Sequence, residues 1–167
     1  MNRKKKLIVL TLVLAIIAAS LFIYESQYFN KVEFLSPIEF EGKIPIRKDV
    51  YGSGEFGARR RGGRAHAGLD ILARIGTPVK ATRSGRVINA QMHKNLGNYV
   101  EIRHSKGFIS IYAHLSKIVV KKGQRLRQSQ LIGEVGKTGN ARYKRIKSHL
   151  HFEIRKNDKA VNPKEYL

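Results

Sequence analysis

The first pattern in the chain is a long apolar segment near its N-terminus. Leu7–Tyr24 is an apolar run interrupted only by Thr11 and Ser20, with no charged residue, and about 20 such residues span a bilayer as a helix. The basic stub formed by residues 1–6 favours a cytoplasmic N-terminus. These features predict a single-pass transmembrane signal-anchor over residues 7–24. A signal peptide cleaved near Ala18–Ser20 is the alternative, which the continuing apolar residues disfavour.

Beyond this segment, the apolar positions occur in short runs. Residues 25–49 contain two prolines and no sustained helical period, which predicts a linker or arm. From residue 50 onward, short β-branched and aromatic runs are separated by glycines, and no segment has an amphipathic helical period of more than two turns. The pattern predicts one mainly β, antiparallel domain over residues 50–167, which is a suitable size for a single core.

Two pairs of runs predict β-hairpins. Residues 79–83 and 86–90 flank a Ser-Gly pair, and residues 99–104 and 108–115 flank Ser105–Gly107. There is also an internal similarity, because the segment from Gly76 to Val87 is similar to the segment from Gly123 to Val135. We therefore expect two related hairpin units.

The strand predicted over residues 148–155 has one apolar face and one polar face. Leu150, Phe152 and Ile154 alternate with His149, His151 and Glu153. By the same period, a strand through the segment 66–71 would place His66 and Asp70 on one face. Three nitrogen or oxygen ligands with a fourth position left open are typical of a catalytic zinc site, whereas structural zinc sites are usually closed and rich in cysteine. The chain has no cysteine.

The chain is strongly basic. Its formal charge is +21, and four Lys or Arg and one Glu within the first 30 residues leave +18 for the remainder. This charge favours an anionic partner, such as a wall polymer or a lipid surface. Nucleic acid is disfavoured, because the N-terminal segment predicts export and no basic recognition helix or aromatic RNA-binding pattern is present.

Seven segments occur in an order and spacing that resemble a known family. They are Phe56–Arg59, His66–Ile71, Gly76–Ala81, Gly85–Val87, Tyr112–Leu115, Gly136–Gly139 and His149–Glu153. Together they resemble the lysostaphin-type, or LytM-type, zinc metalloendopeptidases over roughly residues 50–167. The resemblance implies an antiparallel, duplicated hybrid-motif β domain with a narrow groove over one zinc ion.

The resemblance also implies roles for individual residues. His66, Asp70 and His151 would bind Zn²⁺, and His114 and His149 would be catalytic, with either imidazole as the base that activates water. Glu153 would either orient a histidine or form an ion pair with an arginine. Arg59 would lie near the groove, whereas His93 and His104 are interpreted as structural. The basic segment 60–65 and the loop 140–148 would border the groove.

The implied function is hydrolysis of peptide cross-links in bacterial peptidoglycan on the outer side of the cytoplasmic membrane. The main alternative is a wall-binding scaffold or activator of other hydrolases, because some members of the family lack the metal site. A third hypothesis is a latent enzyme, in which the arm places Asn30 or Glu33 on the open zinc position. The presence of all three ligand positions and both catalytic histidines favours the active enzyme.

Overall fold

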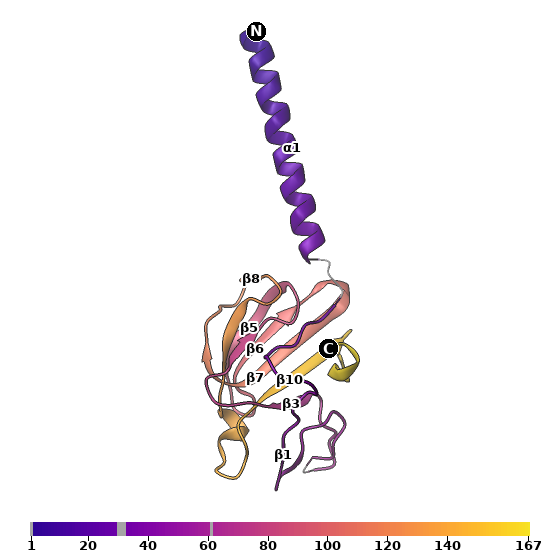
Figure 1. The fold of residues 1–167 in the computed structure, drawn as a ribbon, viewed down its shortest axis with the longest axis vertical. Coiled ribbons are helices and arrows are strands. Elements are labelled where there is room, and N and C mark those ends of the chain that lie inside the picture. Colours follow the sequence, from indigo (N-terminus) through magenta and orange to yellow (C-terminus); the bar gives the residue numbers. More distant parts are fainter. Residues whose placement is uncertain (1, 30–32, 61) are drawn as a thin grey trace.

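The computed structural model describes residues 2–29, 33–60 and 62–167, and within them it contains one α-helix and a mainly β domain (Figure 1). The helix α1 covers Arg3–Phe29. The strands are β1 (Lys48–Asp49), β2 (Gly52–Ser53), β3 (Leu69–Leu72), β4 (Pro78–Lys80), β5 (Gly85–His93), β6 (Gly97–Arg103), β7 (Phe108–Ile118), β8 (Arg125–Leu126), β9 (Leu131–Val135), β10 (His149–Lys156) and β11 (Lys159–Val161). Short 3-10 turns cover Ser105–Gly107, Gly139–Arg142 and Pro163–Glu165.

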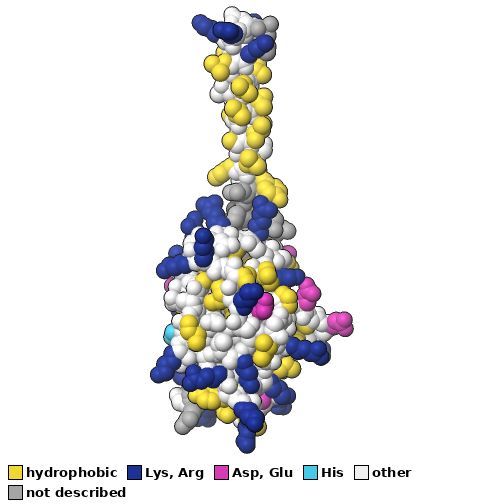
Figure 2. Space-filling view, turned by 90° about the vertical axis from the view of Figure 1, so that its left-hand side faces the viewer, with side chains coloured by type: hydrophobic (Ala, Val, Ile, Leu, Met, Phe, Trp, Pro, Cys, Tyr) yellow, Lys and Arg dark blue, Asp and Glu magenta, His cyan; other side chains and the backbone are white. Residues whose placement is uncertain are grey.

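Helix α1 is apolar on all sides over most of its length. Its segment Arg3–Tyr24 is long and apolar enough to cross a membrane and is not buried against other parts of the chain. The hydroxyls of Thr11 and Ser20 donate hydrogen bonds to carbonyls one turn earlier, at 2.9 and 2.8 Å, so both are satisfied within the helix. Figure 2 shows an apolar column with Lys and Arg at its end. The helix contains the predicted span and extends beyond both of its ends.

The domain is built on one nine-stranded sheet. In the described residues its main path is β11-β10-β7-β6-β5-β8, while β3 pairs with β10, and β9 pairs with both β4 and β7. All these pairings are antiparallel, which confirms the predicted fold class. The core contains side chains that are fully shielded from solvent, among them Leu69, Ile71, Val100, Ile102, Leu115, Ile132, Leu150, Phe152 and Ile154.

The strand pattern at the site was correctly predicted. β6 and β7 form the second predicted hairpin across the turn Ser105–Gly107. β10 begins at His149, and its Leu150 and Phe152 side chains lie in the core. Its alternate side chains, including His151, lie on the opposite face. This face carries the candidate site.

The first predicted hairpin is wrong, because β4 and β5 do not pair with each other. β4 pairs with β9, and β5 pairs with β6 and β8. Gly85 is not at a turn: its φ is not in the left-handed region, and a Cβ atom there would lie 2.4 Å from the carbonyl oxygen of Arg103. This glycine instead allows close approach of β6, because a side chain would clash with that carbonyl group.

The two similar sequence units are interlocked. Val79 of the first unit pairs with Gly133 of the second, and the equivalent Leu126 of the second pairs with Gly85 of the first. Both glycines are tightly packed in the same way, since a Cβ atom on Gly133 would also lie 2.4 Å from a carbonyl oxygen, that of Lys117. The sequence repeat is therefore also a structural repeat, but the matching strands pair between the two units rather than within each unit.

Much of the segment predicted as a linker or arm packs on the domain. Phe34 and Ile38 belong to the buried core, and Ile46 forms a β-bridge with Ile71. β1 and β2 also pair across the predicted boundary at residue 50. The folded unit therefore includes residues from Phe34 onward, because these apolar side chains are stabilised by burial against the sheet.

Candidate metal centre and active site

A groove of about 420 Å³ opens over β3, β7 and β10. The five side chains that the sequence assigns to the site, His66, Asp70, His114, His149 and His151, all line it. The remaining lining residues are Arg47, Tyr51, Arg60, Arg64, Ala65, Ala67, Leu96, Asn140, Ala141, Tyr143 and Ile146. Both loops that were expected to border the groove thus contribute side chains to it.

Three donor atoms converge in this groove. His66 Nε2 lies 3.1 Å from Asp70 Oδ1 and 3.0 Å from His151 Nδ1. Asp70 Oδ1 lies 2.8 Å from His151 Nδ1. All three residues are buried, and the group has the composition and spacing of a metal site. Tetrahedral zinc ligands at about 2.0 Å from the ion are about 3.3 Å apart, so the three donors are already close to the spacing that zinc requires.

The backbone brings these donors together from distant parts of the sequence. Asp70 on β3 is the direct partner of His151 on β10. His66 does not share a strand with Asp70 as expected, because β3 begins only at Leu69. His66 instead belongs to a preceding loop, where its backbone N–H donates to the backbone carbonyl of Ala58 at 2.9 Å. A turn of the chain, rather than strand alternation, therefore places His66 beside Asp70.

The opposite end of each histidine ring is held by an oxygen acceptor. His66 Nδ1 lies 2.8 Å from the carbonyl oxygen of Glu55, and His151 Nε2 lies 2.9 Å from Glu153 Oε1. Neither acceptor can donate, so each of these ring nitrogens carries a hydrogen, and loss of the proton from the opposite ring nitrogen would leave its lone pair directed at the other two donor atoms. Glu153 fulfils both roles considered for it, since its second oxygen accepts from Arg155 at 2.8 Å.

Two arginines hold the second oxygen of Asp70, and sequence reasoning missed both. Asp70 Oδ2 accepts from Arg47 Nη2 at 3.0 Å and from Arg60 Nη2 at 2.8 Å. Arg47 is buried and also pairs with Asp49 at 2.5 Å. These contacts fix the carboxylate so that Oδ1 faces the two histidines. No local motif marks Arg47, because it lies 23 residues before its partner.

The charge states of the trio follow from these contacts. Burial alone would raise the pKa of Asp70, but hydrogen bonds from His151 and His66 hold it well below its usual value. Burial alone would lower the pKa of His151, but its bonds with Asp70 and Glu153 raise it to about 9. Without a metal, His151 is thus protonated at neutral pH, and a metal ion must displace that proton in order to bind.

His114 and His149 face the trio from two neighbouring strands. Their ring centroids are 5.0 Å apart, and His149 Nε2 lies 3.8 Å from Asp70 Oδ1. His114 Nδ1 lies 3.0 Å from the carbonyl oxygen of Thr138, and His149 Nδ1 lies 2.7 Å from that of Lys147. Because a carbonyl only accepts, both rings carry hydrogen on Nδ1, and both Nε2 atoms are free to accept a proton.

Burial keeps these two imidazoles neutral. It lowers the pKa of His114 to about 3, with a further contribution from the nearby His151 and His149 rings. It also lowers the pKa of His149. Both rings are therefore proton acceptors in the neutral pH range, which is the state that a general base requires.

The turn that holds His114 is tightly packed. Thr138 Oγ1 donates to the carbonyl of Leu115 at 2.9 Å and accepts from the N–H of Asn98 at 3.0 Å. A Cβ atom on Gly97 would lie 2.2 Å from this hydroxyl oxygen. His114 itself has a φ of 65°, which is rare for a residue with a side chain. The surrounding contacts thus impose an unusual backbone conformation on the histidine.

Other sequence-based expectations have mixed outcomes. Arg59 is exposed and does not line the groove, whereas the adjacent Arg60 contacts Asp70. His104 is buried outside the groove between the Ser84 carbonyl and the Ser110 hydroxyl, as expected of a structural histidine. His93 is exposed and accepts backbone N–H groups in its own turn.

The latent-enzyme hypothesis is not supported at Glu33. This residue is exposed, its carbonyl accepts from Gln128 at 2.9 Å, and it does not line the groove. Asn30, the other residue considered, lies outside the described residues.

The sequence pattern of Peptidase family M23 matches residues 64–163, and the chain therefore belongs to this family. The expected resemblance to lysostaphin-type peptidases is confirmed. The catalytic domain of lysostaphin from Staphylococcus simulans superposes with a TM-score of 0.60 at 33% identity, which covers 72% of this chain and 91% of that domain.

Two curated relatives differ in what their names state. The chain is 41% identical to the peptidoglycan DD-endopeptidase ShyC of Vibrio cholerae over 101 residues, which is 60% of this chain and 22% of that protein. It is 36% identical to the murein hydrolase activator NlpD of Salmonella typhimurium over 113 residues, which is 67% of this chain and 28% of that protein. The chain spans only between 22% and 38% of the length of its first curated relatives.

Proposed function

We propose that this protein is a zinc-dependent endopeptidase that hydrolyses peptide cross-links in peptidoglycan. The observation that carries the proposal is the convergence of His66 Nε2, Asp70 Oδ1 and His151 Nδ1, at 2.8 to 3.1 Å from one another, in a groove that two further neutral histidines face. The similarity to a protein named as a peptidoglycan DD-endopeptidase supports this substrate class.

His66, Asp70 and His151 would hold the metal ion. Zinc in such a site lowers the pKa of water and polarises a carbonyl group. Glu55 and Glu153 keep the ligand histidines in the required tautomer through the contacts described above. Arg47 and Arg60 hold the carboxylate of Asp70 and offset its charge.

His114 and His149 would handle the protons of the reaction. Both rings line the groove with their centroids 5.0 Å apart, so each Nε2 would be able to accept a hydrogen bond from the attacking water. We assign proton transfer to His149, whose Nε2 lies 3.8 Å from Asp70 Oδ1. His149 takes a proton as the water oxygen bonds to the scissile carbonyl carbon, and then returns it to the leaving nitrogen as the C–N bond breaks. His114 orients the water from the opposite strand.

The N-terminal helix supports a location at the cytoplasmic membrane. We propose that residues 1–6 are cytoplasmic, that residues 7–24 form an uncleaved anchor, and that the domain lies on the outer side. In this arrangement the enzyme would act on the part of the wall nearest to the membrane. The basic character of the domain suits an anionic polymer there.

An activator of other wall hydrolases is the second candidate function. It is favoured by the similarity to NlpD, whose name describes it as a murein hydrolase activator. A protein with only that role has no chemical need for three converging metal donors beside two neutral imidazoles. The complete donor set therefore favours the enzyme.

The deciding experiment is digestion of purified, cross-linked sacculi by the full chain in neutral detergent, with the released fragments identified by mass. A chelator should abolish cleavage and added zinc should restore it. His149→Ala should reduce the rate by about 10²–10⁴-fold, the usual contribution of a general base. His93→Ala is the matched control, because this exposed histidine lies outside the groove. Binding to sacculi without cleavage would exclude the enzyme and favour the activator.

A further inference from the structure

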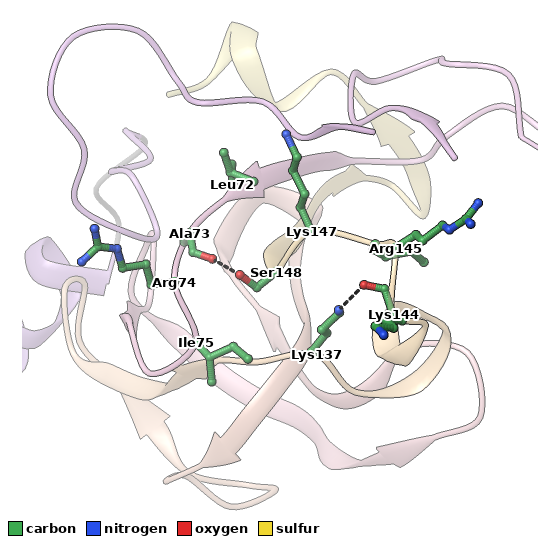
Figure 3. Close-up of a pocket in the computed structure, with 10 residues that line it drawn as sticks. Leu72, Ala73, Arg74, Ile75, Lys137, Lys144, Arg145, Lys147 and Ser148 are labelled. Atoms are coloured by element: carbon green, nitrogen blue, oxygen red, sulfur yellow. Dashed lines mark hydrogen bonds between the residues drawn. The ribbon is translucent and has the colours of Figure 1, made fainter. Parts of the chain in front are cut away.

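A second hollow lies beside the catalytic groove. It has a volume of about 620 Å³ and is lined by the end of β3 and the loop that follows it, by Lys137 after β9, and by residues 144–148 before β10 (Figure 3). Ile146 lines both hollows. Lys147 also belongs to this second hollow, and its carbonyl accepts the hydrogen bond from His149. The pocket and the groove therefore share one wall.

The lining combines positively charged side chains with exposed apolar ones. Half of its ten residues are cationic, namely Arg74, Lys137, Lys144, Arg145 and Lys147, and none is acidic. The exposed Leu72 and Ile75 side chains contribute an apolar surface.

The carboxylate of Asp49, which contacts the backbone of the pocket residue Lys147, is already engaged. Asp49 accepts from the backbone N–H of Lys147 at 3.1 Å, but its other oxygen pairs with the buried Arg47 at 2.5 Å. Among the described residues, no ion pair joins a carboxylate to any of the five lysine and arginine head groups of the pocket. Such a concentration of like charge raises the local concentration of anions.

The cationic side chains are spread around the pocket. Figure 3 shows Arg74 and Arg145 extending outward on opposite sides, with Lys147 at a third position. Lys137 crosses toward Lys144, whose carbonyl accepts from Lys137 Nζ at 3.3 Å. A single small anion would meet one or two of these charges. A chain with repeated negative charges can meet several of them, while its uncharged spacers lie on Leu72 and Ile75.

We propose that this pocket binds a polymer with repeating phosphodiester groups, and that it holds such an envelope polymer alongside the catalytic groove. Phosphate suits Lys and Arg head groups in general, because its oxygens accept several charge-assisted hydrogen bonds. The proposal concerns binding only and does not depend on whether the groove hydrolyses a peptide.

The test uses the full chain in neutral detergent and a fluorescently labelled short poly(glycerol phosphate), with binding followed by fluorescence anisotropy. The pocket variant is R74Q/K144Q/R145Q, in which all three residues are exposed and lie outside the catalytic groove. The control K121Q/K122Q/K159Q removes the same charge from exposed positions outside both hollows. We expect about tenfold weaker binding for the pocket variant, from three exposed charge contacts, and a much smaller change for the control.

Equal losses in both variants would overturn the proposal, because binding would then follow net charge alone. Competition experiments distinguish binding of the polymer from binding of other phosphate-containing ligands. Displacement of the polymer by monomeric glycerol phosphate at the same phosphate concentration would indicate a site for a small anion. More effective displacement by micelles containing phosphatidylglycerol would indicate a membrane surface. Either result would overturn the proposal, whereas preference for the polymer together with selective loss in the pocket variant would support it.

A hydrolysis assay on a phosphate-free, cross-linked peptide keeps this proposal distinct from the function of the groove. The pocket variant should cleave such a peptide at the rate of the unmodified protein. A parallel loss of cleavage and of polymer binding would show that the substitutions disturb the shared wall, and would contradict a separate binding site.

Discussion

The catalytic groove and the cationic pocket are neighbours, but the charged side chains of the donor trio in the groove are buried and paired, whereas most charged side chains of the pocket are exposed. In the groove, Asp70 and His151 are buried, and each polar atom of these two side chains has a defined partner at 2.8 to 3.3 Å. In the pocket, Arg74 and Arg145 are exposed and extend outward. Burial strengthens electrostatic interactions and fixes their geometry, whereas solvent weakens them and permits movement. The groove is thus suited to chemistry at one point, and the pocket to tolerant binding along a chain.

The largest effect is expected from a substitution of a buried charged residue in the groove. Asp70→Asn removes the negative charge that Arg47 and Arg60 share and replaces the carboxylate among the three donors with a weaker, neutral amide. Breaking a buried pair typically costs about 3–5 kcal/mol of stability, and we expect zinc affinity to fall by more than about 100-fold, beyond the cost of losing an outer contact. Denaturant unfolding and chelator competition measure the two effects. Asp158→Asn, at an exposed position, should change neither, and unchanged zinc affinity in Asp70→Asn would remove Asp70 from the ligand set.

His104 tests whether a buried titratable side chain outside the groove also makes the stability of the protein depend on pH. Burial lowers its pKa from 6.5 to about 4. Above pH 6.5 the ring is neutral in both the folded and the unfolded state, so it has no effect. As the pH falls toward 4, only the unfolded state gains a proton, and stability falls by about 3 kcal/mol before levelling off.

The free energy of unfolding should be measured against pH for the unmodified protein and for His104→Gln. The difference between the two curves isolates this residue from the other histidines. It should change between pH 6.5 and 4 and be constant above that window. A pH-independent difference would mean that His104 titrates normally.

Arg47→Met sharpens the comparison by removing one support while leaving all three donors. Asp70 would keep its contact with Arg60 but lose those with Arg47 Nε and Nη2. Loss of such an outer contact typically weakens metal binding by about 10–100-fold. Chelator competition and the thermal stability of zinc-loaded protein provide the readout, with Lys48→Met as the exposed neighbouring control. Equal zinc affinities in the two variants would show that Arg60 alone orients the carboxylate.

The smallest effect is expected in the pocket. The variant R74Q/K144Q/R145Q should unfold within about 0.5 kcal/mol of the unmodified protein, because its charges are exposed. Its residual binding of poly(glycerol phosphate) should depend less on salt, since fewer ion pairs remain to be screened. A titration of anisotropy against ionic strength measures this dependence. Strong destabilisation would show that the pocket cations belong to the folded core network rather than to a tolerant surface.

Sequence reasoning succeeded where a pattern was local. Strand alternation correctly placed His149, His151 and Glu153 together on β10, and the β6–β7 hairpin followed from adjacent runs around one turn. It failed for residues 79–90, because a Ser-Gly pair resembles a turn while Gly85 in fact accommodates close contact with Arg103. Whether a glycine serves a turn or a close approach depends on a partner that is distant in sequence.

The sequence by itself determined the family, the apolar helix, the antiparallel β class and the identity of the histidine and aspartate side chains that line the groove. These properties follow from motif order and from alternation between adjacent residues. Only the tertiary structure decided that the repeated units interlock, that residues from Phe34 onward join the core, and that Arg47 and Arg60 hold Asp70. Such contacts join segments far apart along the chain, so their partners are selected by packing and burial, which no local pattern records.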